Sequence, residues 1–433
     1  MDRDALRAHL ARTPSVRVTG RVLGVTGLAL RFTMPGVRVG DLVHVRRRPG
    51  ERLACEVVGF AEGEAIALPF GSLAGVGPDD EVESTGGAFA VRASDALLGR
   101  VVDGLGRPVD GEGPIDGGEV VPVDRDPPEA LERRPITRPL ATGVRVIDGL
   151  LTLGEGQRVG LFAGSGVGKS SLLGAVARGV EADVVVVALV GERGREVREF
   201  LDRALGQAGR RRSVVVVATS DAAALERLRA AQVATAYAEH FRDQGRRVML
   251  LVDSITRFAR AQREVGLAAG EPPTRRGYPP SVFAMLPRLL ERSGQSRAGS
   301  ITAIYTVLVE GGDMDEPIAD EVRAILDGHV VLDRAIAARG LYPAVDVTVS
   351  LSRVMDAVTT AEHRAAAARL RALVAHHEAK RDLVTLGAYV KGTDRELDLA
   401  LARLPAIARF LAQPLDDRAP FDATVEALQQ IVR

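Results

Sequence analysis

One glycine-rich turn in this sequence contains a single lysine, in the stretch AGSGVGKS at residues 163–170. It follows an apolar run and precedes a pattern with helical spacing. Glycines let the backbone fold so that several N–H groups point inward at a helix N-terminus, which makes a cradle for anions. The residues that would bind phosphate groups in this way are Gly164, Ser165, Gly166, Val167, Gly168, Lys169, Ser170 and Ser171.

Two side chains of this turn have a defined chemistry. The Lys169 ammonium would reach the β- and γ-phosphates, and the Ser170 hydroxyl would ligate Mg²⁺. Lysine occurs elsewhere only at positions 380 and 391, because arginine supplies every other basic side chain. The wide fork of arginine does not fit between two phosphates as a compact ammonium does. The turn therefore predicts binding of a nucleoside triphosphate such as ATP together with Mg²⁺, although Ala163 stands where the strict motif has glycine.

Hydrolysis also requires carboxylates, and two of them end apolar strand patterns. RVMLLVDS ends with Asp253, the expected position of an acid that holds the metal through water. VVVVALVGERG ends with Glu192 and Arg193, and Glu192 is our candidate for polarising the attacking water. Spacing alone leaves a simpler interpretation of each open: a strand-end turn residue for Asp253 and a charged turn for Glu192.

The composition is that of an ordinary soluble globular protein of 433 residues, 46% hydrophobic and 26% charged. Because 57 basic side chains balance 57 acidic ones and aromatic residues make up 4%, we expect no nucleic-acid partner. No apolar run reaches the roughly 18 residues of a membrane span, and the N-terminus lacks the pattern of a signal peptide. With Cys55 as its one cysteine, the chain is expected in the reducing cytoplasm.

Hydrophobic patterning divides the chain into three parts. Residues 1–82 contain short alternating apolar runs separated by glycines, which predict a small antiparallel β-barrel. Residues 83–355 begin with a Gly- and Pro-rich connector and continue as apolar strands that alternate with helical patterns, typical of an α/β fold with a parallel sheet. Residues 356–433 lose the strand pattern and predict a helical domain.

Local patterns predict the elements of the second and third parts. The expected strands are RVGLFAG, DVVVVALVG, SVVVVATS, RVMLLVDS, SITAIYTVL and, at residues 344–352, AVDVTVSLS. The connector at residues 103–128 contains so many turn formers that we expect no regular structure there. In the helical part, Thr393 and Glu396 fit a capping box at the start of a helix.

Long stretches of the chain resemble the catalytic subunits of rotary ATPases: TGVRVIDGLLTLGEGQRVGLFAGSGVGKSSLL, GERGREV, LLVDSITRFARAQREVG and RGLYPAVDVTVSLSRV. Two others, GEPPTRRGYPPSVFAMLPRLLERSG and YTVLVEGGDMDEPIADEVRAILDGHVVL, are more narrowly similar to the ATPases of type III secretion systems, flagellar or injectisome. The resemblance covers nearly the whole chain from about residue 16. It implies an α/β fold with a RecA-like P-loop NTPase core, an N-terminal antiparallel β-barrel and a C-terminal helical domain.

The resemblance also implies roles for individual residues. Those already inferred keep their roles, namely Lys169, Ser170, Glu192 and Asp253. Arg193 would lie beside the γ-phosphate, and Tyr342 would pack on adenine. Arg353 matches the arginine finger, which in the family reaches the nucleotide of the neighbouring subunit and contributes about a thousandfold or more to turnover. The family forms homohexamers, and a chain that carries both Glu192 and Arg353 is able to build identical complete sites.

By this resemblance the chain is an ATP-hydrolysing motor that releases export substrates from chaperones and unfolds them at an export gate. The implied partners are further copies of the chain, a stator-like coiled-coil regulator, a central stalk protein, an export-gate membrane protein and chaperone–substrate complexes. The motor would work in the cytoplasm, held at the inner face of the cell membrane through these partners. Arg275 and Arg276 would border a central pore, and Leu6 and Leu10 would share one side of an N-terminal amphipathic helix.

Three other functions share parts of these patterns. A catalytic subunit of a proton-translocating rotary ATPase has the same core, but vacuolar-type chains carry a large insertion before the P-loop, and GYPPSVF departs from the rotary pattern. A catalytically silent assembly subunit would not need Glu192. An RNA-driven hexameric translocase would need aromatic and basic side chains on its barrel, for which this sequence offers Phe32, Phe60, Phe70, Arg46, Arg47 and Arg48.

Overall fold

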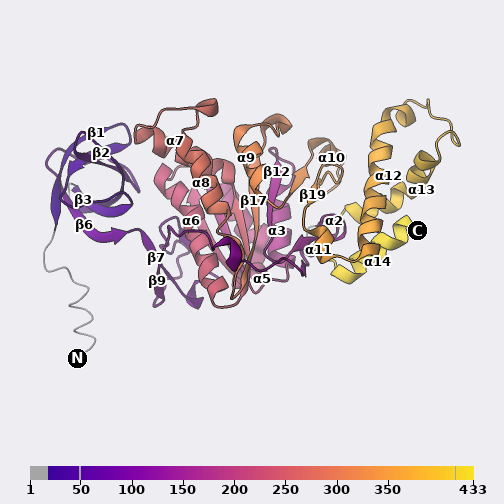
Figure 1. Ribbon diagram of the computed structural model, residues 1–433, viewed down its shortest axis with the longest axis horizontal. Helices are drawn as coiled ribbons and strands as arrows, with labels where there is room; N and C mark the ends of the chain where they lie inside the picture. The colour runs from indigo at the N-terminus through magenta and orange to yellow at the C-terminus, as the bar shows by residue number, and fades with distance from the viewer. Residues whose placement is uncertain (1–17, 48–49, 415) are drawn as a thin grey trace.

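The computed structural model describes residues 18–47, 50–414 and 416–433. A β-barrel, a central α/β domain and a group of helices follow one another along its longest axis (Figure 1). This order confirms the expected fold class. The expected N-terminal helix with Leu6 and Leu10 lies outside the described residues.

The barrel is closed and antiparallel, with strand order β1-β2-β5-β4-β3-β6. Alternate residues of its strands fill the interior, for example Val43 and Val45 of β3 and Cys55 and Val57 of β4. The strands are β1 (Thr19–Thr26), β2 (Ala29–Thr33), β3 (Asp41–Arg47), β4 (Glu51–Ala61), β5 (Glu64–Pro69) and β6 (Glu81–Ala88). Strand β6 thus crosses the boundary that we placed at residue 82.

Most of the barrel side chains on which the RNA-driven alternative depends are buried or paired with other residues of the barrel. Phe32 and Phe70 are buried, and of the three phenylalanines only Phe60 is exposed. Arg46 and Arg47 form ion pairs with acidic side chains of the barrel strands. The positions that the structure describes therefore leave neither a stacking platform nor a free basic patch, and Arg48 lies outside the described residues.

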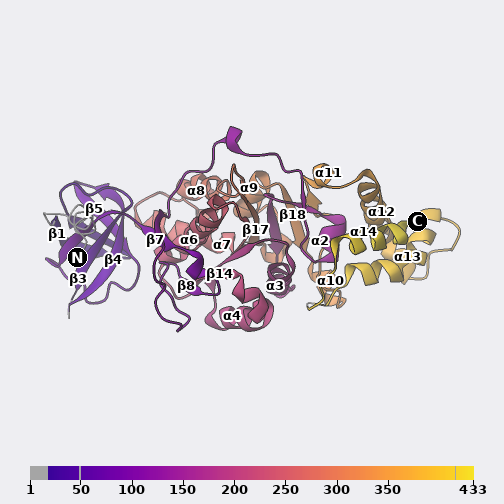
Figure 2. The same cartoon turned by 90° about the horizontal axis from the view of Figure 1, so that it is seen from below.

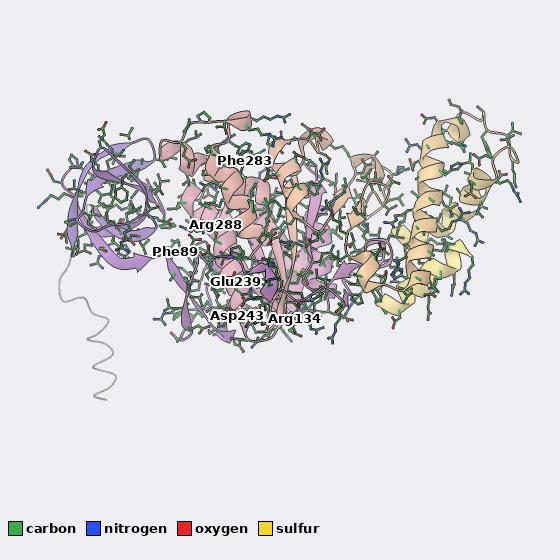
Figure 3. All side chains as sticks on the ribbon, viewed as in Figure 1. Phe89, Arg134, Glu239, Asp243, Phe283 and Arg288 are labelled. Carbon is green, nitrogen blue, oxygen red and sulfur yellow. The ribbon has the colours of Figure 1, made fainter. Side chains whose placement is uncertain are left out.

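Phe89 attaches the barrel to the central domain, at whose boundary it lies in Figure 3. Its ring centroid is 5.6 Å from that of Phe70 in the barrel, and the Arg229 guanidinium of the central domain lies 6.0 Å from the same ring. Arg229 also forms a buried ion pair with Glu56 of β4. A buried charge requires its partner, so this pair ties the two parts together.

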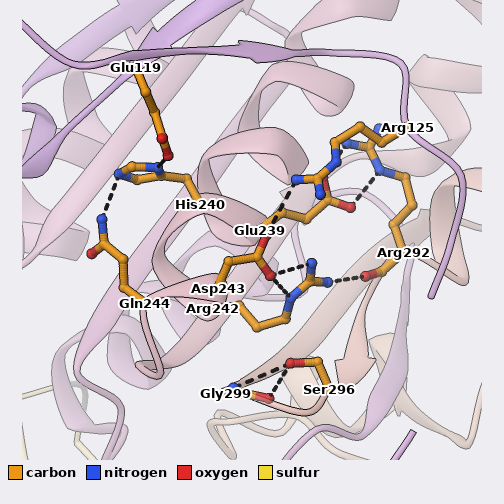
Figure 4. A network of polar contacts seen from close by, with 10 residues as sticks. All are labelled: Glu119, Arg125, Glu239, His240, Arg242, Asp243, Gln244, Arg292, Ser296 and Gly299. Atoms are coloured by element: carbon orange, nitrogen blue, oxygen red, sulfur yellow. Dashed lines mark hydrogen bonds and ion pairs between the residues drawn. The ribbon is translucent and has the colours of Figure 1, made fainter. Parts of the chain in front are cut away.

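The connector is fastened to the central domain by a polar network (Figure 4). His240 Nδ1 lies 2.7 Å from Glu119 Oε1 of the connector. The Arg292 guanidinium donates to the connector carbonyl of Val123 at 2.8 Å and is paired with the buried Glu239 carboxylate at 2.7 Å. The connector therefore has a defined path over the domain.

The expectation that the connector lacks regular structure is wrong in one short stretch. Strand β9 (Glu119–Pro122) pairs antiparallel with β7 (Ala90–Ala93). Strand β8 (Val101–Asp103) joins the edge of the central sheet beside β14. Its apolar pair Val101 and Val102 lies just before the connector and is too short to predict a strand by itself, so its pairing with β14 is what makes it one.

The central sheet has the strand order β19-β18-β12-β17-β15-β13-β14-β8, and its pairings are parallel from β18 to β8. Both faces are covered, as near-continuous apolar strands require (Figure 2). On one side lie α8 (Pro280–Leu290) and α9 (Pro317–Ile325), and on the other lie α3 (Lys169–Gly179) and α4 (Gly194–Glu199). The remaining strands are β12 (Arg158–Ala163), β13 (Val184–Glu192), β14 (Ser213–Thr219), β15 (Arg247–Asp253), β16 (Gly294–Gln295), β17 (Ser300–Leu308), β18 (Gly328–Leu332) and β19 (Leu351–Ser352).

Helices connect these strands in the order that the sequence patterns predict. They are α2 (Arg145–Leu150), α3 (Lys169–Gly179), α4 (Gly194–Glu199) with its π-helical continuation (Phe200–Leu205), α5 (Gly206–Arg211), α6 (Ala224–Asp243), α7 (Ile255–Ala268), α8 (Pro280–Leu290), α9 (Pro317–Ile325), α10 (Arg334–Ala338) and α11 (Met355–Val358).

The predicted strand at residues 344–352 is wrong over most of its length. At its end β19 pairs antiparallel with β18, and before it Val345 forms a single antiparallel bridge with Leu332 of β18. The Asp346 carboxylate accepts hydrogen bonds from the Thr348 N–H at 2.9 Å and from its hydroxyl at 2.6 Å, and the Ser350 hydroxyl returns to the Asp346 carbonyl. These local side-chain bonds form turns in competition with a strand. Strand β18 (Gly328–Leu332), which was absent from the expected strands, takes the place in the sheet.

The C-terminal part consists of α12 (Ala361–Thr385), α13 (Arg395–Leu411) and α14 (Phe421–Val432). The predicted capping box is wrong, because the Asp394 carboxylate, one residue after Thr393, accepts from the N–H groups of Glu396 and Leu397 at 3.1 Å. Within the part of the chain that the structure describes, none of the helices combines the length and apolar character that spanning a membrane requires.

Candidate active site

The glycine-rich turn joins the end of β12 to the start of α3, as predicted. Gly166 and Gly168 have φ angles of 78° and 91°, a region that side-chain-bearing residues rarely adopt. Gly168 is the N-cap of α3 and has no side chain with which to cap it. The first N–H groups of this 11-residue helix are therefore free of a side-chain cap, which suits them to a phosphate group.

Lys169 meets both predicted carboxylates. Its Nζ lies 3.3 Å from Glu192 Oε1 and forms a second, shorter contact with Asp253 Oδ1. Glu192 and Asp253 end the adjacent parallel strands β13 and β15, and both are buried, with 6% and 1% of their surface exposed. The structure thus brings together three residues that lie 23 and 84 positions apart in the sequence.

Glu192 has two further partners that the sequence did not reveal. Arg257, in the first turn of α7, forms an ion pair with its carboxylate, and Glu196 of α4 shares a hydrogen bond with it. Burial raises the pKa of Glu192, the hydrogen bond with Glu196 acts in the same direction, and the positive charges of Lys169 and Arg257 oppose the rise. The sequence signal for Arg257 is its position four residues after Asp253, where a helix following the strand turns back over the edge.

Asp253 is held in place by Thr306 of β17, whose hydroxyl donates to Asp253 Oδ1 at 2.8 Å. No sequence pattern singled out Thr306. Ser170 lies exposed in the first turn of α3, beside Lys169. Asp253 and Ser170 therefore offer a carboxylate and a hydroxyl oxygen near the phosphate cradle.

Tyr342 lies close to the glycine-rich turn, where it lines a cavity of about 420 Å³. A Cβ atom at Gly168 would lie 3.4 Å from its ring, so the turn and the ring are in close reach. The opposite wall includes Leu172 and Ala175 of α3. Gln413, which follows α13, donates its N–H to the Tyr342 carbonyl at 2.8 Å and also lines the cavity. An apolar cavity of this kind beside a phosphate cradle suits a planar base.

The two predicted arginines do not join this cluster. The Arg193 side chain is 78% exposed and pairs with Glu196 at 3.4 Å. Arg353 is exposed and follows β19, so β18, β12, β17 and β15 lie between it and the strand of Glu192. Within one chain the candidate site therefore lacks the predicted finger.

Comparison with known proteins assigns the family. Residues 143–352 match the nucleotide-binding domain of the ATP synthase alpha/beta family, and residues 359–430 match the C-terminal domain of the type III secretion ATPase EscN. The chain is 52% identical to a type 3 secretion system ATPase of Xanthomonas euvesicatoria, over 98% of this chain and 97% of that protein. It belongs to the type III secretion and flagellar export ATPase family.

Other relatives agree with this assignment. The flagellum-specific ATP synthase of Bacillus subtilis (strain 168) is 50% identical over 97% of this chain and 96% of its own length. The assembled ATPase EscN of enteropathogenic E. coli has a TM-score of 0.91 at 46% identity, covering 96% of this chain and all of that chain. EscN in complex with its central stalk EscO gives a TM-score of 0.89 at 45% identity. The protein is an ATPase of the export family, and the recognised fold and family are confirmed.

Proposed function

We propose that this export ATPase works as a homohexamer in which each chain binds ATP on its own P-loop and receives Arg353 from a neighbour. The observation that carries the proposal is the separation of Arg353 from Lys169 and Glu192 within one chain. A finger typically contributes about a thousandfold or more to turnover, so an isolated chain has an incomplete site. That EscN has been studied as an assembled ATPase supports the same arrangement here.

Within the site, the N–H groups at the start of α3 and the Lys169 ammonium would bind the phosphates, and Tyr342 would pack on the adenine. Lys169 must exchange its contacts with Glu192 and Asp253 for contacts with the γ-phosphate when ATP enters. That exchange releases the Glu192 carboxylate to accept a hydrogen bond from the attacking water. Burial keeps this carboxylate away from bulk solvent and so strengthens its interaction with that water.

The residues present fit Mg²⁺ bound together with ATP. Among residues 18–47, 50–414 and 416–433, no group of three or more His, Cys, Asp and Glu side chains could hold a metal by itself. Mg²⁺ usually keeps several waters and takes one or two protein ligands plus phosphate oxygens. The Ser170 hydroxyl would be a direct ligand, and Asp253 would act through water. When bound, the metal neutralises the charge that develops on the phosphates.

We further propose that ATP hydrolysis by this protein drives type III protein export, by releasing substrates from chaperones and unfolding them at the export gate. The match of residues 359–430 to the EscN C-terminal domain supports export rather than proton translocation. The C-terminal helices would contact chaperone–substrate complexes, and the barrel would contact a stator-like coiled coil. A central stalk, as in the complex of EscN with EscO, and an export-gate membrane protein would hold the motor at the cytoplasmic face of the membrane.

The variant Arg353→Ala tests the assembly proposal. We expect it to bind ATP nearly as the wild type does and to form the same oligomer, while hydrolysis falls by about a thousandfold. Turnover at the wild-type rate would remove the finger from the proposal.

Affinity isolation of the tagged protein from its native cells, with partners identified by mass spectrometry, tests the export role. A stator, a stalk protein and an export-gate component are expected, and recovery of proton-pump subunits instead would overturn it.

A further inference from the structure

Gln157 is a fully buried side chain placed just before β12, the strand that leads into the P-loop. A buried amide is costly unless it is hydrogen-bonded, and here both ends of the amide are used. Gln157 Oε1 accepts from the Gly154 N–H at 2.9 Å. Its Nε2 donates to the Asp327 carbonyl at 3.0 Å and to the Ser352 hydroxyl oxygen at 3.1 Å. Two of its bonds thus hold segments that are about two hundred residues away in the chain.

Both contacts lie directly beside the backbone of Arg353. Ser352 directly precedes Arg353, and its hydroxyl donates to the Thr152 carbonyl at 2.9 Å. The Asp327 carbonyl that Gln157 binds also accepts the Arg353 N–H at 3.0 Å. The guanidinium of Arg353, in contrast, has no ion-pair partner in the residues that the structure describes. The base of Arg353 is fixed while its tip remains available.

Neighbouring contacts reinforce this attachment. The Asp327 carboxylate forms a two-point ion pair with Arg158, at 3.0 Å to Nε and 3.2 Å to the terminal nitrogen, and accepts the Arg158 backbone N–H at 3.1 Å. A Cβ atom at Gly328 would lie 2.5 Å from the Leu351 carbonyl oxygen, so only glycine lets β18 and β19 approach this closely. The start of the P-loop strand and the base of the arginine are therefore one rigid unit.

We propose that Gln157 is a positioning residue for the arginine finger, which it fixes to the amino end of the P-loop strand. This rests on the proposed trans action of Arg353. Strand β12 spans Arg158–Ala163, a stiff length of about 20 Å between two paired neighbours, with Gln157 at one end and the phosphate cradle at the other. The segment that carries the finger is thus anchored to the same strand that leads into the subunit's own P-loop.

The test compares kcat, KM and ATP binding of the assembled, full-length protein and its variants. Gln157→Glu keeps the acceptor for Gly154 and removes the donor to Asp327 and Ser352. Ser352→Ala removes one of these contacts at smaller risk to folding. Since misplacing a catalytic group by about 1 Å costs up to about a hundredfold in rate, we expect kcat to fall by about tenfold or more in Gln157→Glu and less in Ser352→Ala. KM and the affinity for ATP are expected to stay within about twofold of wild type, a change much smaller than the expected fall in kcat. The oligomeric state is expected to be that of the wild type.

The matched control is Ser300→Ala. Ser300 is a buried serine at the same end of the sheet, and its hydroxyl donates to Glu155 at 2.9 Å without contacting the finger segment. We expect unchanged kcat in this variant. The double variant Gln157→Glu with Arg353→Ala is expected to be no slower than Arg353→Ala alone, because a finger that is absent cannot be misplaced. The proposal would be overturned if the kcat losses of the two single variants multiplied in the double variant. It would also be overturned if Gln157→Glu lost ATP binding in parallel with kcat.

Mixed assemblies separate an effect on the finger from damage to the P-loop of the same chain. Lys169→Ala chains cannot bind ATP properly but carry an intact finger. Mixing them with Gln157→Glu chains should restore turnover at sites where a good P-loop meets a good finger, and no restoration would overturn the proposal. Mixing Lys169→Ala with Arg353→Ala chains is the reference. If that reference mixture stays inactive, the chains do not form mixed assemblies that complement each other. The comparison of the double variant with Arg353→Ala then tests the role of Gln157 by itself. If Arg353→Ala is itself fully active, the proposed trans finger fails, whatever Gln157 does.

Discussion

The guanidinium of Arg257 and the carboxylate of Glu192 form an ion pair at the carboxyl edge of the central sheet. Arg257 comes from the first turn of α7 and Glu192 from the end of β13, so the pair bridges two neighbouring connections. A positive charge in contact with a buried carboxylate favours its ionised form. Arg257 thus opposes the effect of burial on the residue that we assign to the attacking water.

The pH dependence of hydrolysis should therefore respond to Arg257. The pKa of Glu192 is raised by burial, so hydrolysis is expected to fall as the pH drops through that raised value and the carboxylate takes up a proton. Arg257→Ala removes an opposing charge, which raises this pKa further and moves the acid limb of the kcat profile to higher pH. Arg260→Ala, on the same helix and paired with Glu310, is the control. Superimposable profiles for wild type and Arg257→Ala would contradict the assignment.

Binding and hydrolysis should be separable at the P-loop. Lys169→Ala is expected to lose ATP binding, because Lys169 is the basic side chain in the first turn of α3, beside the phosphate cradle. Glu192→Gln should bind ATP and hydrolyse it about a hundred- to ten-thousandfold more slowly, the usual contribution of a general base. Equilibrium binding of labelled ATP and steady-state phosphate release measure the two effects. Lys380→Ala removes a lysine that pairs with Asp394 in the C-terminal part and should change neither.

Tyr342 should control affinity for the base. Stacking of a base on an aromatic ring is worth about 1–3 kcal/mol, so Tyr342→Ala is expected to raise KM for ATP by about tenfold or more. Tyr342→Phe keeps the ring and should behave like the wild type. Steady-state kinetics over a range of ATP concentrations test this, and equal KM values for wild type and Tyr342→Ala would exclude the cavity beside Gly168 as the adenine site.

The loop between α7 and α8 should matter for export rather than for hydrolysis. Arg276 pairs with Asp313 at 3.4 Å and Arg275 with Asp320 at 3.6 Å, so this loop is fastened to α9 and to the segment before it. Reversing both arginine charges to Glu is expected to abolish coupling to a central partner. The rate of ATP hydrolysis by the purified protein should stay within about twofold of the wild-type rate, because exposed ion pairs contribute little to stability. Arg288→Glu, an exposed arginine of α8, is the control; intact export in the double reversal would refute the pore assignment.

Several parts of the site could be predicted because their determinants are local. Glycines at 166 and 168 adopt left-handed φ angles between a strand and a helix, and each step of that pattern lies within a few residues. Glu192 and Asp253 were found because each directly follows a long apolar strand. The Asp394 cap was missed in favour of Thr393, since two neighbouring residues both have capping side chains and only the backbone path decides which one is used.

The sequence by itself determined the P-loop, the two carboxylates at strand ends, the order of barrel, α/β core and helices, and the family. Only the tertiary structure decided that Arg257 and Thr306 meet these carboxylates and that residues 347–349 form a turn while β18 enters the sheet. It alone placed Gln157 against Asp327 and Ser352. The physical reason is that a parallel sheet pairs strands from distant parts of the chain. The contacts at its edges therefore depend on strand order, which no local pattern of residues specifies.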